Sequence, residues 1–295
     1  MFVATLIAAP SGPGLPAGAV ADVAGRLGVP ARDATWLDDG FAADIGFENP
    51  VTADLRAEIA GLASAAGFDL VVQERAGRRK RFLIADMDST MIDQECIDEL
   101  AAEVGIKDRV AAITARAMNG EIAFEPALRE RVALLAGLPE ATIGKVIAER
   151  ITLASGGGTL VATMRAHGAH TALVSGGFTV FTGPIAERLG FHEDRANRLL
   201  ATGGKLTGAV AEPILGAAAK VEALRQIGGR LGIAPADVLA VGDGANDLPM
   251  LELAGSGVAL HAKPSVAGRA RHRIDHGDLT ALLFLQGYRR DEFRS

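Results

Sequence analysis

Two clusters of carboxylates follow apolar segments, and their spacing suits chemistry at a metal ion. The first apolar segment, residues 82–85, runs directly into Asp86 and Asp88. The second, residues 238–241, opens into residues 242–247, which read GDGAND. Carboxylates are costly to remove from water unless something compensates for their charge. Either cluster alone could be a polar turn capped by an aspartate, but two such strand ends in one chain predict a site at a sheet edge.

This set of oxygen donors predicts phosphoryl transfer. One carboxylate of Asp86 and Asp88 can attack phosphorus to form an acyl phosphate, while the other carries a proton. The charge of a phosphoryl group calls for a cation. The candidate ligands Asp86, Asp243 and Asp247 offer hard oxygens, which favour Mg²⁺. The set contains no His or Cys, which argues against zinc or copper.

Two further segments could bind phosphate oxygens. Ser175, Gly176 and Gly177 follow an expected strand at 171–174 and precede an expected helix, so a hydroxyl and backbone N–H groups meet a helix N-terminus. The same three residues could form an ordinary turn. Lys220 lies in the small, apolar start of another expected helix. It is either a solvated surface charge or the second cation that a phosphate dianion needs.

In this order, the four blocks resemble the haloacid dehalogenase superfamily of phosphohydrolases. The matching residues, within about 82–290, are Asp86-x-Asp88-x-Thr90, Ser175, Lys220 and Gly242-Asp243-Gly244-x-x-Asp247. The resemblance implies that Asp86 attacks phosphorus. It implies that Asp88 protonates the leaving group, later activates water, and ligates Mg²⁺ through its backbone carbonyl. Ser175 and Lys220 would hold the phosphoryl group, Asp243 would bind the metal, and Asp247 would support it.

Segments 86–97, 124–132 and 174–179 narrow the resemblance to the phosphoserine phosphatases. In that family the glutamate matching Glu95 takes the substrate ammonium, and the arginine matching Arg131 takes the carboxylate. An arginine can bind a carboxylate through two parallel bonds. Viewed alone, Glu95 could be an exposed residue in a first helical turn, and Arg131 a charge on a helix surface.

The remaining matches complete a substrate site. Asn246 matches a residue that orients substrate and phosphate, and Met118 and Phe124 match apolar lid residues that exclude water. The resemblance implies hydrolysis of O-phospho-L-serine through a phosphoaspartyl enzyme, the last step of serine biosynthesis. The alternatives are another small phosphomonoester as substrate, phosphoryl transfer to an alcohol such as homoserine, or an amino-acid-sensing regulatory protein.

The element pattern predicts an α/β protein with a doubly wound, Rossmann-like parallel sheet over residues 82–295, as in the haloacid dehalogenase fold. Apolar runs predict strands at 82–85, 171–174, 238–241 and 257–260, with helices at 178–189, 216–231, 247–253 and 279–285. Helical spacing between the first two strands, at 92–104, 109–118, 127–136 and 141–148, predicts an α-helical cap inserted at about 93–160.

Residues 1–75 carry no concentrated chemistry and predict a small α+β domain. A strand at 2–8, helix at 18–27, hairpin at 38–40, helix at 53–65 and strand at 68–72 give the order βαββαβ, which is ferredoxin-like. This order resembles ACT-like amino-acid-binding modules. We expect the Arg-rich segment 75–81 to be a solvated linker, and His272 and His276 to lie on the surface.

Composition limits the partners. The length of 295 residues suggests two domains, or one domain with an insertion, and a hydrophobic content of 49% is enough for a sizeable core. Its net charge of −6 gives no basic footprint for nucleic acid or anionic membranes. The single cysteine, Cys96, excludes an internal disulfide, and we expect it to be buried and inert. With no basic leader segment, a cytoplasmic protein with a small-molecule substrate is expected. The oligomeric state stays open, a homodimer being one option.

Overall fold

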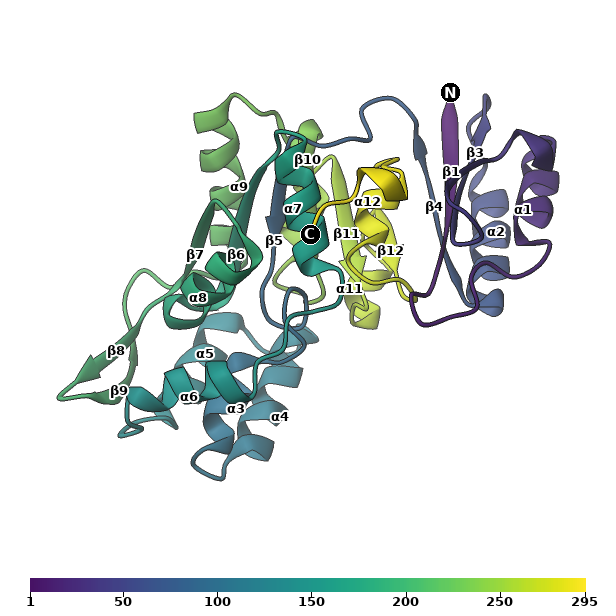
Figure 1. Cartoon of the computed structure of the whole chain (residues 1–295). Helices are drawn as coiled ribbons and strands as arrows, with labels where there is room; N and C mark the ends of the chain where they lie inside the picture. The colour runs from purple at the N-terminus through teal and green to yellow at the C-terminus, as the bar shows by residue number, and fades with distance from the viewer.

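The computed structural model describes residues 1–295 apart from the side chain of Met118, so the prediction for that side chain lies outside what is described. Two large sheets dominate the fold. A four-stranded sheet has the order β2-β3-β1-β4, and a six-stranded sheet has the order β12-β11-β10-β5-β6-β7. In Figure 1 the four-stranded sheet, coloured purple to blue, lies at the right of the six-stranded one.

The first sheet is antiparallel and confirms the predicted order βαββαβ. Its elements are β1 (Phe2–Ala8), α1 (Ala19–Leu27), β2 (Thr35–Asp38), β3 (Ala42–Phe47), α2 (Ala53–Ala66) and β4 (Phe68–Glu74), with a 3₁₀ turn at Ala31–Asp33. Successive residues of a strand point to opposite faces. Leu6 accordingly packs with the side chains of α1 and α2, and Ile7 packs with α12 (Ala281–Leu285) of the second unit.

The six-stranded sheet is parallel throughout, which confirms the predicted doubly wound core. Its strands are β5 (Phe82–Ala85), β6 (His170–Phe178), β7 (Glu193–Asn197), β10 (Val238–Gly242), β11 (Ser256–Leu260) and β12 (His272–Ile274). The central strands are apolar because helices cover both faces. The edge strands β7 and β12 were not predicted, since they are short and carry charged residues.

Helices form a layer on each face of this sheet. On one face, Phe82 and Ile84 pack against α9 (Ala217–Leu231) and α10 (Leu248–Leu253). On the other, Leu83 and Ala85 pack with α7 (Gly157–Ala166), α8 (Thr179–Leu189) and α12. The unpredicted helix α7 begins with two glycines, which weaken the helical pattern. The short helix α11 (Pro264–Ala267) and 3₁₀ turns at Pro235–Asp237 and Arg290–Glu292 complete the layers.

Four helices between β5 and β6 form the predicted cap, which lies below the sheet in Figure 1. They are α3 (Cys96–Ala102), α4 (Lys107–Met118), α5 (Phe124–Ala133) and α6 (Ala141–Glu149). Strands β8 (Leu199–Thr202) and β9 (Lys205–Val210) form an antiparallel hairpin. The first cap helix begins later than the predicted residue 92, because Ser89 adopts a left-handed conformation in a turn and Ile92 forms a β-bridge with Leu153.

Two predictions about charged residues were wrong. The linker is not solvated along its length: Arg78 is largely buried, and its Nη2 lies 2.6 Å from Oδ2 of Asp44. Lys80 Nζ donates to two backbone carbonyls, at 2.7 and 2.8 Å. His272 is only 6% exposed, because its short strand lies beside β4. Arg78 and Lys80 thus bind groups of both units, since Asp44 belongs to the N-terminal sheet and Ala236 to the core.

The chain passes from one sheet to the other between β4 and β5, which supports the proposed division into residues 1–75 and 82–295. The two units are nevertheless in close contact. The carboxylate of Asp69 on β4 accepts hydrogen bonds from the backbone N–H groups of residues 275–277. Among the helices described, none has both the length and the hydrophobicity needed to cross a bilayer.

Candidate active site

The candidate site lies where three neighbouring strands end. Ala85 of β5 is in register with Val241 of β10 and with Leu173 of β6, and these strands run parallel. Their carboxyl ends therefore meet at one edge, as predicted for such sheets. The backbone N–H of Asp86 continues the pairing by donating to the carbonyl of Val241 at 3.0 Å. The two carboxylate clusters and the Ser175 segment are thereby brought together.

Three buried carboxylates form the floor of the site. Oxygens of Asp86, Asp243 and Asp247 all lie within 4.8 Å of one another. The Nζ atom of Lys220 lies 2.6 Å from Oδ1 of Asp86 and 2.6 Å from Oδ1 of Asp247. Lys220 is only 2% exposed, so it is not a solvated surface charge. When all three are ionised, three carboxylates and one ammonium leave two negative charges, which a divalent cation would balance. The donor set therefore fits a hard divalent metal ion.

The electrostatics of this floor follow from burial and crowding. Burial raises the pKa of Asp86 to about 7, the charge of Asp247 adds to the effect, and Lys220 opposes it. Burial, Asp247 and Asp86 together hold the pKa of Asp243 well above its usual range. Burial alone would lower the pKa of Lys220, but Asp247 and Asp86 raise it, so this lysine stays charged. A cation would compete with protons for the same carboxylates.

Backbone geometry fixes Asp247 in place. Its Oδ2 accepts a hydrogen bond from the Gly244 N–H at 3.0 Å, and its Oδ1 accepts one from Lys220. A Cβ atom at position 242 would lie 2.4 Å from Cγ of Asp247, so only glycine fits there. The hydroxyl of Thr90 donates to Oδ1 of Asp243 at 3.3 Å. Gly242 and Gly244 therefore allow the Asp247 carboxylate to pack closely against the end of β10.

Asp88 lies above this floor. Its Oδ1 accepts a hydrogen bond from the Cys96 N–H at 3.0 Å, and a Cβ atom at Gly177 would lie 2.8 Å from its Oδ2. Burial raises the pKa of Asp88, and the Cys96 N–H partly offsets the rise. An aspartate with a raised pKa is suited to carrying a proton. Cys96 is itself buried, as predicted, and burial raises its thiol pKa well above the usual value.

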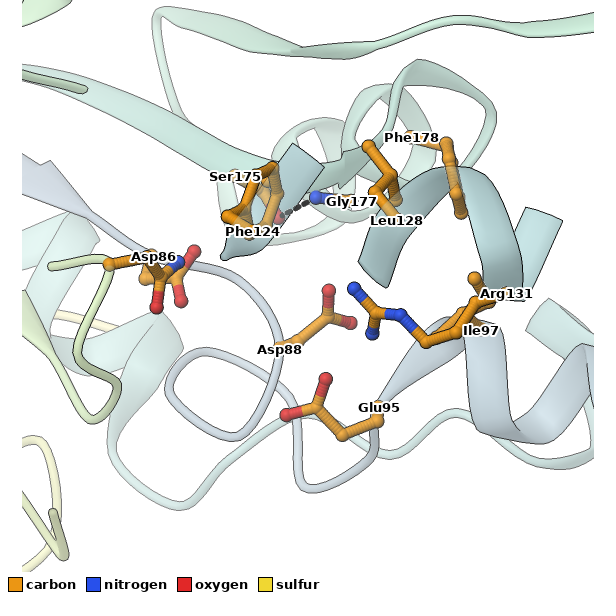
Figure 2. A pocket seen from close by; sticks show the side chains of 12 residues that line it. Asp86, Asp88, Glu95, Ile97, Phe124, Leu128, Arg131, Ser175, Gly177 and Phe178 are labelled. Carbon is orange, nitrogen blue, oxygen red and sulfur yellow. Dashed lines mark hydrogen bonds between the residues drawn. The ribbon is translucent and has the colours of Figure 1, made fainter. Parts of the chain in front are cut away.

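The Ser-Gly-Gly segment ends β6 and faces the same pocket. The Oγ of Ser175 accepts a hydrogen bond from the Gly177 N–H at 2.8 Å, which leaves its own hydrogen free to donate. A Cβ atom at Gly176 would lie 2.8 Å from the ring of Phe124, so glycine lets the cap side chain approach the sheet. Figure 2 shows the hydrogen bond between Ser175 and Gly177, and both residues line the pocket.

Arg131 reaches the pocket from α5 and is only 6% exposed, so it is not a surface charge. Its Nη1 donates to Oγ1 of Thr114 at 3.0 Å, and that hydroxyl donates to Oδ1 of Asp98 at 2.8 Å. Figure 2 shows the guanidinium pointing toward Asp88 in the middle of the pocket. Thr114 and Asp98 were not predicted, although Asp98 lies one helical turn from Glu95.

Glu95 precedes α3 and also points into the pocket (Figure 2). Its Oε1 accepts a hydrogen bond from the hydroxyl of Ser89 at 2.8 Å. Burial raises the pKa of Glu95 well above its usual value, and the negative charges of Asp88 and Asp243 add to the rise. An ammonium group placed beside Glu95 would lower that pKa and be held by the resulting carboxylate.

The pocket also has an apolar wall. It is lined by twelve residues: Asp86, Asp88, Glu95, Ile97, Phe124, Leu128, Arg131, Ser175, Gly176, Gly177, Phe178 and Asn246. Ile97, Leu128 and Phe178 were not predicted. Leu128 lies three residues before Arg131 on the same helix face, a spacing that could have identified it. The Oδ1 atom of Asn246 is buried and meets no hydrogen-bond partner among the residues described, so it is available to a ligand.

A family model for haloacid dehalogenase-like hydrolases matches residues 83–252, and the chain belongs to this family. Among its relatives is a phosphoserine phosphatase from Streptomyces coelicolor, 42% identical over 243 residues. That alignment covers 82% of this chain and 59% of the relative. The chain therefore spans less than two thirds of that relative's length.

Two solved structures share the fold. A haloacid dehalogenase family hydrolase from Salmonella enterica serovar Typhi superimposes with a TM-score of 0.84 at 30% identity, over 97% of this chain and 99% of that one. A phosphoserine phosphatase, solved as a phospho-aspartyl intermediate analogue, gives a TM-score of 0.67 at 41% identity, over 70% of this chain and 98% of that one. The first likeness includes the N-terminal sheet, and the second is confined to about two thirds of the chain.

Proposed function

We propose that this protein is a phosphoserine phosphatase, which hydrolyses O-phospho-L-serine to L-serine and phosphate. The observation that carries the proposal is the two-ended pocket. Arg131 and Glu95 provide a cation and an anion for an amino acid headgroup, and Asp86 lies at the other end beside Lys220. The identity with phosphoserine phosphatases, one of them solved as a phospho-aspartyl intermediate analogue, supports this reading.

In this proposal Asp86 is the nucleophile. Its carboxylate oxygen forms a bond to phosphorus while the bond to the serine oxygen breaks, giving a phosphoaspartyl enzyme and an alkoxide leaving group. Asp88, whose pKa is raised by burial, donates a proton to that leaving group. The resulting Asp88 carboxylate then takes a proton from water as the water attacks phosphorus and releases Asp86. Ser175, Gly176 and Lys220 hold the phosphoryl oxygens.

We further propose Mg²⁺ as the divalent ion, held by the side chains of Asp86 and Asp243, the backbone carbonyl of Asp88 and, indirectly, Asp247. When bound, it would neutralise charge on the phosphoryl group. The support is the surplus of two negative charges in a cluster made only of oxygen donors. Mg²⁺ is the ion that such a set favours over zinc or copper.

The substrate's amino acid end would lie against the cap. Arg131 would bind its carboxylate, Glu95 its ammonium, and Asn246 would orient the molecule between headgroup and phosphate. Phe124 would contribute to excluding water from the closed site. A role in serine biosynthesis, a cytoplasmic location, a homodimer and the lack of nucleic-acid and membrane partners stay predictions.

The proposal is tested by measuring phosphate release from O-phospho-L-serine with and without Mg²⁺. The wild-type chain should turn over only when the metal is present, and Asp86→Asn should be inactive under both conditions. Chelation should abolish activity and added Mg²⁺ should restore it. A chain that hydrolyses p-nitrophenyl phosphate with Mg²⁺ but leaves phosphoserine intact would refute the substrate while sparing the reaction class.

A further inference from the structure

A second cleft, of about 700 Å³, lies between the N-terminal sheet and the core. Its lining comes from both units, with Arg56 on α2, residues 73 and 74 on β4, the segment after β4, and residues just before β10 and β12. The active site lies where β5 and β10 end, whereas this cleft lies where β5, β10 and β12 begin. Because the strands are parallel, the two sites occupy opposite edges of the sheet.

The lining of this cleft is positively charged. Four cationic side chains, Arg56, Arg78, Lys80 and Arg271, face two carboxylates, Glu74 and Asp237. The whole chain carries a net charge of −6, so the cleft is an exception to the overall balance. A concave surface with an excess of one sign of charge concentrates ligands of the opposite sign.

Neutral partners hold most of these cations in place. Arg56 Nη1 donates to the carbonyl of Val72 at 3.1 Å, Lys80 Nζ to that of Ala236 at 2.8 Å, and Arg271 Nη1 to that of Gly255 at 2.8 Å. In the described part of the chain, no ion pair engages any of these three side chains. Carbonyl oxygens therefore position these cations, and no carboxylate of the described residues is in direct contact with them.

Arg78 adds an unused donor. Its Nη2 is paired with Asp44, but its Nη1 is buried and has no hydrogen-bond partner among the described residues. The pKa of His272, which also lines the cleft, follows from its burial and from these same cations. Burial lowers the pKa of its imidazole to about 4, and the charges of Arg271, Arg56 and Lys80 add to the effect. Arg78 itself lines the cleft, and a buried polar group without a partner costs free energy.

We propose that this cleft binds a compact dianion, with Arg56 from the N-terminal unit and Arg271 from the core both contributing to the site. Guanidinium groups bind carboxylates and tetrahedral oxyanions through charge-assisted hydrogen bonds, so either chemistry fits. Since the two arginines belong to different units, the bound anion stabilises the contact between them. The inference does not depend on the proposed phosphatase activity.

The test is a titration of the full chain with malonate and, separately, with sulfate, at constant ionic strength set with chloride. The ring resonances of His272, assigned with His272→Gln, locate the binding, since an anion in the active site lies at the other sheet edge. We expect a saturable change with a dianion and none with chloride. Arg56→Gln and Arg271→Gln should each weaken binding by about tenfold or more.

The matched control is Arg269→Gln, because Arg269 is exposed and pairs with Glu252 outside the cleft. It should bind like wild type, and all variants should keep the wild-type melting midpoint without ligand. Saturation by only one of the two dianions supports the site and identifies its chemistry as carboxylate or tetrahedral oxyanion. No saturable change with either dianion, or equal affinity in all three arginine variants, would overturn the proposal.

Discussion

At the scale of single residues, Lys220 shows how one buried charge organises the site. It lies within 2.6 Å of two carboxylates that follow different strands, and so ties the end of β5 to the end of β10. A buried charge is tolerated only when it is paired in this way. The sequence shows only a lysine among small residues, which is equally typical of a surface position. The partners that make it functional are brought to it by the fold.

Arg131 is the residue that we expect to distinguish phosphoserine from other phosphomonoesters. Arg131→Ala should raise KM for phosphoserine by about 100-fold, because a charge-assisted contact to the carboxylate is lost. KM for p-nitrophenyl phosphate, which has no carboxylate, should change little. Arg129→Ala is the matched control, since Arg129 is on the same helix but exposed and paired with Glu212. Equal effects of Arg131→Ala on both substrates would count against the headgroup assignment.

Thr114 positions Arg131 rather than touching the substrate. Thr114→Val removes the hydroxyl that links Arg131 to Asp98 while keeping the shape of the side chain. KM for phosphoserine should rise by about tenfold with kcat nearly unchanged, since one hydrogen bond to a charged group is lost. Thr114→Ser should restore KM because it keeps the hydroxyl. A fall in kcat that serine does not rescue would assign Thr114 a merely structural role.

At the scale of elements, the short strand β12 makes stability depend on pH. His272 is buried on this strand, and its pKa is lowered from 6.5 to about 4. The unfolded chain therefore binds a proton at a higher pH than the folded chain does. Stability from this residue is fully present above about pH 6.5 and is lost as the pH falls toward 4, with about 2 kcal/mol gone by pH 5.

The measurement is chemical denaturation at pH 7 and pH 5. His272→Gln should lose less stability between these two pH values than wild type, by about the same 2 kcal/mol. His261→Asn is the control, because His261 is exposed and asparagine tolerates its positive φ. Identical pH slopes for wild type and His272→Gln would show that the buried imidazole does not contribute.

The sequence pattern identifies the central strands, which are buried on both faces, and misses the strands at the edges of the sheet. The apolar runs of β5 and β10 are unmistakable because both faces are covered. The edge strand β7 reads EDRAN, and only its pairing with β6 makes it a strand. Similarly, helical spacing alone suggests a first cap helix from residue 92. The left-handed Ser89 and the turns after it depend on tertiary contacts.

At the scale of the whole molecule, one apolar cluster crosses the boundary between the two units. Ile7, Leu37 and Val71 of the N-terminal sheet pack in the same cluster as Leu282 and Phe284 of α12. The spacing of the motifs could predict the candidate active site, because Asp86 and Asp243 directly follow apolar strands. It could not predict this contact, nor the burial of Arg78 and His272, because neither follows from local periodicity.

Deletion of residues 1–75 tests how far the units are independent. The active-site residues lie outside the deleted segment, so turnover should persist, with kcat within about tenfold of wild type. The melting midpoint should fall by several degrees, because the apolar face of α12 and the N–H groups bound by Asp69 become exposed. A truncated chain that is folded but wholly inactive would show that the N-terminal unit is more than an accessory.

The covalent role of Asp86 is the central claim, and acid trapping tests it most directly. The enzyme is mixed with phosphoserine carrying radiolabelled phosphate, quenched in acid within one turnover, digested, and the labelled peptide sequenced. Label is expected on the peptide containing Asp86, and no labelled peptide is expected from Asp86→Asn. Label on a different residue, or full turnover by Asp86→Asn, would contradict that claim.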